Sequence, residues 1–163
     1  MAIDPTLDVV NQQLQGGADW EVGGKLNLDT VAGGNLQVDD KPVPLKATFS
    51  PAAGAANVCL VTLQLGDGNG NMAFPAIVDI YLSDAAAGGA LTATTASGAV
   101  AAGASGTDLD AMVAKKALRV LTDATGKYIL SITDSAKTLF VPCVMLPCGR
   151  HVAGTALVVG NYG

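Results

Sequence analysis

The sequence contains few charged side chains and few aromatic rings. Charged residues make up 14% of the 163 residues and aromatic residues 4%, whereas about a quarter of an average domain is charged. Hydrophobic residues nevertheless reach 50%, and there are 20 glycines, so the chain is too apolar to be disordered. We expect one domain with an appendage, or two very small domains, built from thin elements joined by many turns.

Basic residues and long apolar runs are also scarce. The net charge is −5, and Lys115–Lys116 is the only adjacent basic pair, whereas nucleic acids and anionic membranes are bound by clustered Lys and Arg. No stretch approaches the roughly 20 apolar residues of a membrane span, and residues 1–5 do not begin a secretory signal. We predict no nucleic acid and no membrane as partners, and a protein that stays in the cytoplasm or leaves it by a route not encoded at this terminus.

Cysteine is limited to Cys59, Cys143 and Cys148. An odd number of cysteines without a secretory signal is typical of a reducing compartment. The spacing of the last two cysteines matches neither a zinc knuckle nor a redox C-x-x-C pair. We interpret all three as buried thiols on strands, with a disulfide as the alternative.

Residues that carry chemistry are sparse. His151 is the single histidine, so a Ser-His-Asp or Cys-His catalytic group would have to use it, and neither a Gly-x-Ser-x-Gly nor a nucleotide-binding glycine pattern occurs. We interpret His151 as an edge residue at the start of a strand, and the pairs Asp39-Asp40 and Asp108/Asp110 as solvated carboxylates. We therefore predict no catalytic residue, no cofactor and no enzymatic activity.

The run Asp67-Gly-Asn-Gly-Asn71 resembles the start of an EF-hand calcium loop, because oxygen side chains alternate along it. The match fails at position six, which is Met72 rather than glycine, and at position twelve, which is Val78 rather than glutamate. A glycine-rich hairpin turn explains the same residues. We therefore predict no metal site.

Residues 1–20 are expected to form an N-terminal arm. Asp4 is suited to cap a short helix with Pro5 at its first position, and Gly16-Gly17 ends it. Trp20, the only tryptophan, is expected either to pack in the core or to anchor a partner, since tryptophan is over-represented at interface centres. The candidate docking residues are Leu7, Val10, Leu14 and Trp20.

Residues 21–54 contain short apolar segments separated by turn residues, and they form either part of the main sheet or a docking segment. Pro44 favours a sheet edge for its segment, because proline cannot donate a hydrogen bond to the ladder. The run Ser50-Pro-Ala-Ala-Gly54 predicts a linker or a long turn. We place a soft boundary there and predict the main domain at 55–163.

The main domain shows clear strand patterns. Residues 57–65 and 76–82 alternate as strands, and Ile77, Asp79 and Tyr81 are expected on one face of the second. Residues 85–106, rich in Ala, Gly, Ser and Thr, predict an exposed loop with room for a short edge strand at 91–95. Residues 108–121 fit either a helix capped by Asp108 or a strand at 117–121, and the following segment favours the strand.

Residues 117–121 and 128–133 flank a tight turn, which predicts a β-hairpin, and two final strands are predicted at 139–146 and 151–159. Strands that recur between polar turns in this way are typical of an antiparallel sandwich. The predicted fold class is therefore all-β: an antiparallel immunoglobulin-like β-sandwich with an N-terminal arm and short extra strands.

The segment Val120-Leu-Thr-Asp-Ala-Thr-Gly-Lys-Tyr-Ile-Leu-Ser-Ile-Thr-Asp134, followed by Leu139-Phe-Val-Pro-Cys143, is similar to a hairpin in small β-sandwich proteins of tailed-bacteriophage virions. Val78-Asp-Ile-Tyr-Leu-Ser-Asp84 before an Ala/Gly-rich loop also fits. The resemblance covers roughly residues 57–163. It implies a structural virion protein that docks on the capsid surface as a decoration or cement protein and stabilises the shell.

The resemblance also implies the major capsid protein as a partner, copies associated in threes or twos, and a place in the virion after assembly in the host cytoplasm. It carries over no functional residue. The alternative is a receptor- or carbohydrate-binding module of a phage head fibre or tail, with the loop at 85–106 facing the host. A cryptic enzyme with His151 as its base is the third hypothesis.

Overall fold

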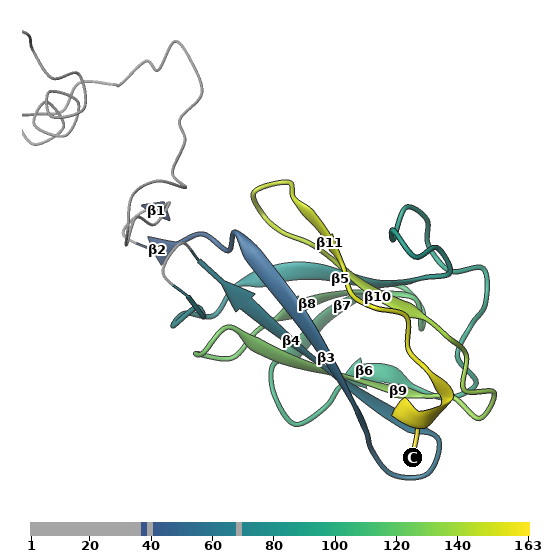
Figure 1. Cartoon of the computed structure of the whole chain (residues 1–163). Helices are drawn as coiled ribbons and strands as arrows, with labels where there is room; N and C mark the ends of the chain where they lie inside the picture. Colours follow the sequence, from purple (N-terminus) through teal and green to yellow (C-terminus); the bar gives the residue numbers. More distant parts are fainter. Residues whose placement is uncertain (1–36, 39–40, 68–69) are drawn as a thin grey trace, which may run out of the picture.

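The computed structural model describes residues 37–38, 41–67 and 70–163, and it shows an all-β sandwich of two antiparallel sheets (Figure 1). No helix in this described part is long and apolar enough to cross a membrane. The arm, with its candidate docking residues Leu7, Val10, Leu14 and Trp20, lies outside the described residues, and so does the pair Asp39-Asp40.

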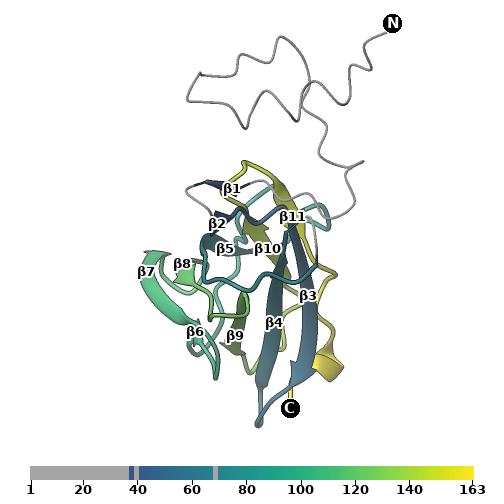
Figure 2. The ribbon, with the colours of Figure 1, turned by 90° about the vertical axis from the view of Figure 1, so that its left-hand side faces the viewer.

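The two sheets differ in size. The smaller has the order β3-β4-β9-β6, with β3 (Lys46–Ala53), β4 (Val58–Gly66), β9 (Lys127–Thr133) and β6 (Val100–Ala102). The larger has the order β11-β10-β5-β8-β7, with β11 (His151–Ala153), β10 (Val141–Met145), β5 (Ile77–Ser83), β8 (Ala117–Leu121) and β7 (Thr107–Val113). A separate short ladder pairs β1 (Gln37–Val38) with β2 (Lys41–Pro42). A 3-10 turn, η2 (Val159–Asn161), lies beside β3 near the C-terminus (Figures 1 and 2).

The core lies between the two sheets and follows the alternation of the strands. Every second residue of β4, β5, β8 and β9 is apolar and buried, because successive strand residues point to opposite faces. Burying one large apolar side chain contributes about 1.5–3 kcal/mol, so these strands supply most of the hydrophobic stabilisation. Their main core residues are Cys59, Val61, Leu63, Leu65, Val78, Ile80, Leu82, Leu118, Val120, Tyr128, Leu130 and Ile132.

The predicted strands at 57–65 and 76–82 are confirmed, with a shift of one residue at each end. The strand at 117–121 is confirmed as β8. The sandwich also extends further toward the N-terminus than residue 55, because β3 pairs with β4 along its whole length. As the proline pattern indicated, β3 is an edge strand. The predicted linker at 50–54 is wrong, because residues 50–53 form the second half of β3 and pair with β4.

The predicted hairpin between residues 117–121 and 128–133 is wrong. β8 pairs with β5 and β7, whereas β9 pairs with β4 and β6. The turn at 122–126 therefore carries the chain from one sheet to the other. A hairpin within one sheet and a crossing between two sheets have the same sequence pattern, because in both arrangements each strand points its apolar residues into the shared core.

The alternative of a helix capped by Asp108 is excluded, because residues 107–113 form strand β7. Two further predictions were wrong in detail, and the first is the edge strand at 91–95, which contains no strand. The loop region instead holds β6, which pairs with β9, and it buries Thr92, Ala96 and Val100. The last predicted strand is shortened to β11, and residues 154–163, which contain η2 but no strand, bury Leu157 and Tyr162 against the core.

Asp108 is not solvated as predicted but ties the two sheets together. Its carboxylate on β7 accepts a hydrogen bond from the hydroxyl of Tyr128 on β9 (2.5 Å) and another from the amide of Ala102 on β6 (2.9 Å). Tyr128 is fully buried. Burial raises the pKa of its phenol, and the hydrogen bond to Asp108 raises it further. The pair thus supplies a polar partner for a tyrosine that the core would otherwise leave unsatisfied.

Candidate functional site

The side of the five-stranded sheet that faces away from the core is the most distinctive surface of the described chain. We call it the outer face. Neighbouring strands place its residues in rows, because paired residues in an antiparallel sheet point to the same side. The outer face consists of Ile77, Asp79, Tyr81, Asp110, Val113, Ala117, Arg119, Leu121, Cys143 and Met145.

Three rows cross the outer face. The middle row carries the charges: Met145 on β10, Asp79 on β5, Arg119 on β8 and Asp110 on β7 lie side by side. An upper row of Cys143, Tyr81, Ala117 and Val113 flanks it, and a lower row of Ile77 and Leu121 flanks it on the other side. The outer face is therefore an apolar surface with one charged stripe.

An ion pair lies at the centre of the charged stripe. The Nε of Arg119 is 2.8 Å from one oxygen of Asp79, and its Nη2 is 3.0 Å from the other. These hydrogen bonds and the charges of Asp79 and Asp110 raise the pKa of the guanidinium. The side chains of Arg119 and Asp79 remain 50% and 32% exposed, so the pair contributes little to stability and stays accessible to a partner.

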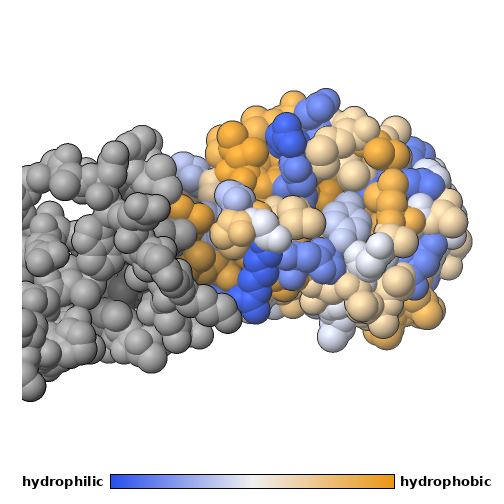
Figure 3. Space-filling view, turned by 90° about the horizontal axis from the view of Figure 1, so that it is seen from above, coloured by the Kyte–Doolittle hydropathy of each residue, from blue (hydrophilic) through white to orange (hydrophobic). Residues whose placement is uncertain are grey.

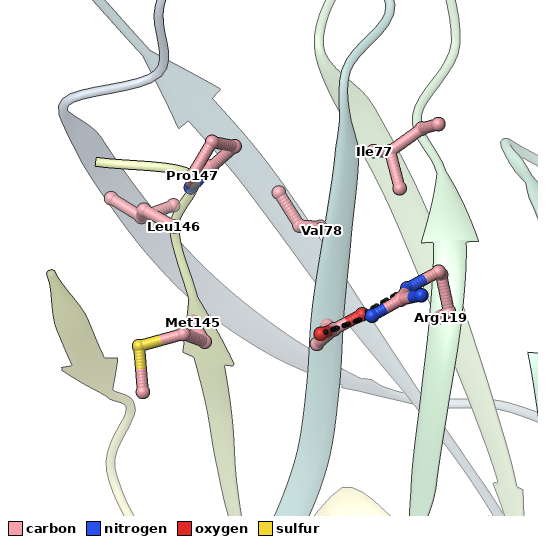
Figure 4. A pocket seen from close by; sticks show the side chains of 7 residues that line it. Ile77, Val78, Arg119, Met145, Leu146 and Pro147 are labelled. Atoms are coloured by element: carbon pink, nitrogen blue, oxygen red, sulfur yellow. Dashed lines mark hydrogen bonds and ion pairs between the residues drawn. The ribbon is translucent and has the colours of Figure 1, made fainter. Parts of the chain in front are cut away.

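Two open hollows lie on the outer face and share Met145. One, of about 330 Å³, lies between the ion pair and the end of β10 and is lined by Ile77, Asp79, Arg119, Met145 and Pro147, among others. Figure 4 shows Met145 and Arg119 on either side of the strand that carries Val78. The other hollow, of about 360 Å³, is lined by Tyr81, Leu91, Met112, Ala117 and Met145.

Several large apolar side chains on or beside the outer face are exposed. Ile77 is 52% exposed and Met145 41%, and Leu91, Met112 and Val113 are similar. The opposite side of the molecule differs, because the outward rows of the four-stranded sheet carry mainly polar residues such as Thr48, Gln64 and Lys127. Figure 3, which views the molecule from above relative to Figure 1, shows hydrophobic residues interspersed with hydrophilic ones. A concentrated apolar surface on a β-sandwich is typical of a contact site.

Tyr81 and His151 fasten a loop over one corner of the outer face. The Tyr81 hydroxyl lies 2.5 Å from the carbonyl oxygen of Gly88 and 2.7 Å from Nε2 of His151, and the two rings stack. Both contacts are satisfied when His151 donates to the hydroxyl and the hydroxyl donates to Gly88. Gly88 has φ +69, and a Cβ there would lie 2.6 Å from the sulfur of Cys143. The loop therefore needs glycine at this point.

The same corner brings Cys143 close to His151, which is the arrangement that a Cys-His nucleophile would require. Burial raises the pKa of the Cys143 thiol to about 11, against a smaller opposing effect of its contact with Tyr81. A nucleophilic cysteine needs a lowered pKa and some exposure, and Cys143 is fully buried. The geometry of this corner is that of a structural fastening. His151 does begin an edge strand, as the sequence predicted.

The remaining candidates lie apart from the outer face. Cys59 and Cys143 are buried on strands as predicted, but Cys148 is exposed in the turn between β10 and β11, and all three are free thiols. The Asp67 carboxylate accepts the amide of Gly70 at 3.0 Å within the turn. Among the described residues, no three His, Cys, Asp or Glu side chains gather where they could hold a metal ion.

Sequence reasoning placed Ile77, Asp79 and Tyr81 on one face of a strand, and this is confirmed. It did not find the outer face itself, because the partners of these residues on β7, β8 and β10 come from distant parts of the chain. The sequence signal for an outward-facing side of this strand is the alternation in β5, where Asp79 and Tyr81 lie on the side opposite the buried apolar residues. Comparisons with protein-family models, with curated proteins and with solved structures find no match to this chain.

Proposed function

We propose that this chain is a structural virion protein that docks on the capsid surface as a decoration or cement protein. The observation that carries the proposal is the outer face, an accessible apolar surface on a closed sandwich. Its hollows are open and shallow, whereas the site of an enzyme or a small ligand is a concave pocket that encloses its occupant. Such a surface fits contact with another protein. The virion as the place of that contact rests on the resemblance of residues 57–163 to phage β-sandwich proteins.

The distribution of charge supports different contacts for the arm and for the sandwich. Residues 1–36 contain five acidic side chains and one basic side chain, whereas residues 41–163 contain seven acidic and eight basic ones. Residues 1–36 therefore carry most of the net negative charge, and the arm within them contains Leu7, Val10, Leu14 and Trp20. We assign it to the shell, where it would fit an apolar groove with basic side chains, because opposite charges steer association and select the partner.

Co-sedimentation tests this function. The full chain is mixed with capsids of the same source, and the particles are separated on a density gradient. We expect stoichiometric co-sedimentation that weakens as salt is raised, because salt screens exposed charges. The variant with Leu7, Leu14 and Trp20 changed to Ser should lose binding, and a matched variant with Thr48, Ser50 and Thr62 changed to Ala on the other sheet should keep it.

Sedimentation of the full chain as a free small protein would overturn the virion role. The alternative, a carbohydrate- or receptor-binding module, would gain from binding on a glycan array. The outer face gives little support to this alternative. Sugar sites favour aromatic platforms, and Tyr81 is the only aromatic residue in the three rows of the outer face.

A further inference from the structure

The outer face has an internal complementarity that points to one particular occupant. Three residue pairs join β5 to β8 at its centre: Ile77 with Leu121, Asp79 with Arg119, and Tyr81 with Ala117. Each pair matches in character, since the first is apolar with apolar, the second is anion with cation, and the third is large with small.

We infer that the outer face binds the outer face of a second copy of this chain, related to it by a two-fold axis that runs along the strands between β5 and β8. Such an axis lies in the plane of the contact. It places β5 of one copy opposite β8 of the other, with paired residues at the same height along the strands. The surface is then self-complementary, as a two-fold interface must be.

The charged stripe explains why the second copy fits. With this axis, Asp79 of each copy faces Arg119 of the other, so the intrachain ion pairs become a closed network of two carboxylates and two guanidinium groups. Both side chains are partly exposed, so they can turn toward the partner without unfolding the sheet. Burying them in a network leaves neither charge unpaired, which is the condition for burying a charge at low cost.

The apolar rows agree with the same arrangement. The hollow beside Ala117, lined also by Leu91 and Met112, lies opposite Tyr81 of the second copy, so a small residue meets a large one. Ile77, which is 52% exposed, lies opposite Leu121. The middle and lower rows of the two sheets then pack face to face with their strands about 30° from parallel, and in the upper row the loop at Gly88 lies between the sheets.

The expected strength of this contact follows from its size. Four strands spaced about 4.8 Å apart and three rows of side chains give about 400 Å² on each copy. A total of about 800 Å² is below the size of stable specific interfaces and fits a weak contact. We therefore expect a dimer that dissociates in the micromolar range. The inference rests on the proposed function only in taking the outer face as a surface for protein contact.

The test uses the full chain and two charge reversals, measured by sedimentation velocity and native mass spectrometry. We expect the natural chain to form dimers between about 1 and about 200 µM. Asp79→Arg places four guanidinium groups at the contact and Arg119→Asp places four carboxylates, so each variant alone should dimerise at least about tenfold more weakly. An equimolar mixture of the two should restore dimerisation, as heterodimers that contain one copy of each.

Lys46→Asp, on the exposed edge of the other sheet, is the matched control for Arg119→Asp and should dimerise normally. A natural chain that stays monomeric over the whole range would overturn the inference. Single reversals that dimerise as well as the natural chain, or a mixture that restores nothing, would also overturn it. Capsid co-sedimentation is scored separately, so dimers that do not bind capsids would count against the virion function alone.

Discussion

Asp134 follows β9 and is 1% exposed. Its carboxylate accepts hydrogen bonds from the amides of Thr138 (2.8 Å), Ser97 (3.1 Å) and Ala136 (3.4 Å). Burial by itself raises the pKa of this carboxyl, but the hydrogen bonds, led by those from Thr138, outweigh it and lower the pKa to about 2. At the scale of single residues, this charge fixes the turn between β9 and β10 to the long loop before β6.

The lowered pKa of Asp134 predicts a loss of stability in acid. A group whose folded pKa lies below its unfolded value near 3.8 stabilises the fold above that value and loses this effect as pH falls toward the folded pKa of about 2. The contribution at neutral pH is about 2 kcal/mol. Urea unfolding of the natural chain should therefore show a steep fall in the free energy of unfolding between about pH 4 and pH 2.

Asp134→Asn should be destabilised at pH 7 by about 2 kcal/mol, because one acceptor oxygen and the charge are lost. Its free energy of unfolding should change less between pH 4 and pH 2 than that of the natural chain. Burial raises the pKa of the Asp123 carboxyl, but hydrogen bonds from Ser105 and Thr125 outweigh this effect and lower the pKa. Asp123 therefore maintains part of the pH dependence of stability in this variant. Asp110→Asn on the exposed edge is the control, and an equal loss in this variant would contradict the assignment.

At the scale of elements, Gly126 decides how the chain crosses from β8 to β9. It has φ +70, a left-handed conformation that favours glycine, and an added Cβ would lie 2.6 Å from the Cβ of Met72. Its carbonyl accepts the amide of Leu65 on β4. The crossing turn is therefore tied to the four-stranded sheet by backbone contacts that a larger residue would push apart.

Gly126→Ala is expected to lower the free energy of unfolding by about 2 kcal/mol or more, from backbone strain and from displacement of Met72. Gly160→Ala is the matched control, because an added Cβ there meets no atom within 4 Å. The control should stay within about 0.5 kcal/mol of the natural chain. Chemical denaturation of both variants measures the difference, and equal effects would show that the turn tolerates a side chain.

The fastening of the loop by Tyr81 gives a second prediction for elements. Tyr81→Phe removes the hydroxyl that joins Gly88 to His151, so amide hydrogen exchange at Gly88 and its neighbours should become faster. Tyr162→Phe loses a similar hydrogen bond, to the carbonyl of Thr138 at 2.7 Å, far from this loop. Faster loop exchange in both variants would indicate a general loss of stability rather than release of the loop.

At the scale of the whole molecule, the two ends of the chain should differ in their effect on folding. Among the described residues, the hydrophobic core and the residues packed against it extend from Ala47 to Tyr162. Removal of residues 1–36 deletes none of these side chains, and we expect the free energy of unfolding to stay within about 0.5 kcal/mol. Removal of residues 154–163 should cost about 3 kcal/mol or more, since it deletes the buried side chains of Leu157 and Tyr162 and exposes the core residues that they cover. Thermal and urea unfolding compare the two, and an equal loss at both ends would contradict this division.

The sequence alone was enough to determine the fold class and the faces of the central strands. Alternation in residues 57–65, 76–82 and 128–133 assigns each side chain to the core or to the outside, because the period of a strand is two whatever its neighbours are. The same local rule explains why Cys59 is buried in the core. Cys143 lies on the outer face and is buried instead under the loop at Gly88, and Cys148, which was also predicted to be buried, is exposed in a turn.

Pairing was decided only by the tertiary structure. Strands 117–121 and 128–133 have the pattern of a hairpin, yet they lie in different sheets, because residues that face a shared core look alike in either arrangement. Asp108 finds Tyr128 across that core, and the outer face joins residues from β5, β7, β8 and β10. Such contacts depend on which strands are neighbours, and the alternation within one strand contains no information about its neighbours.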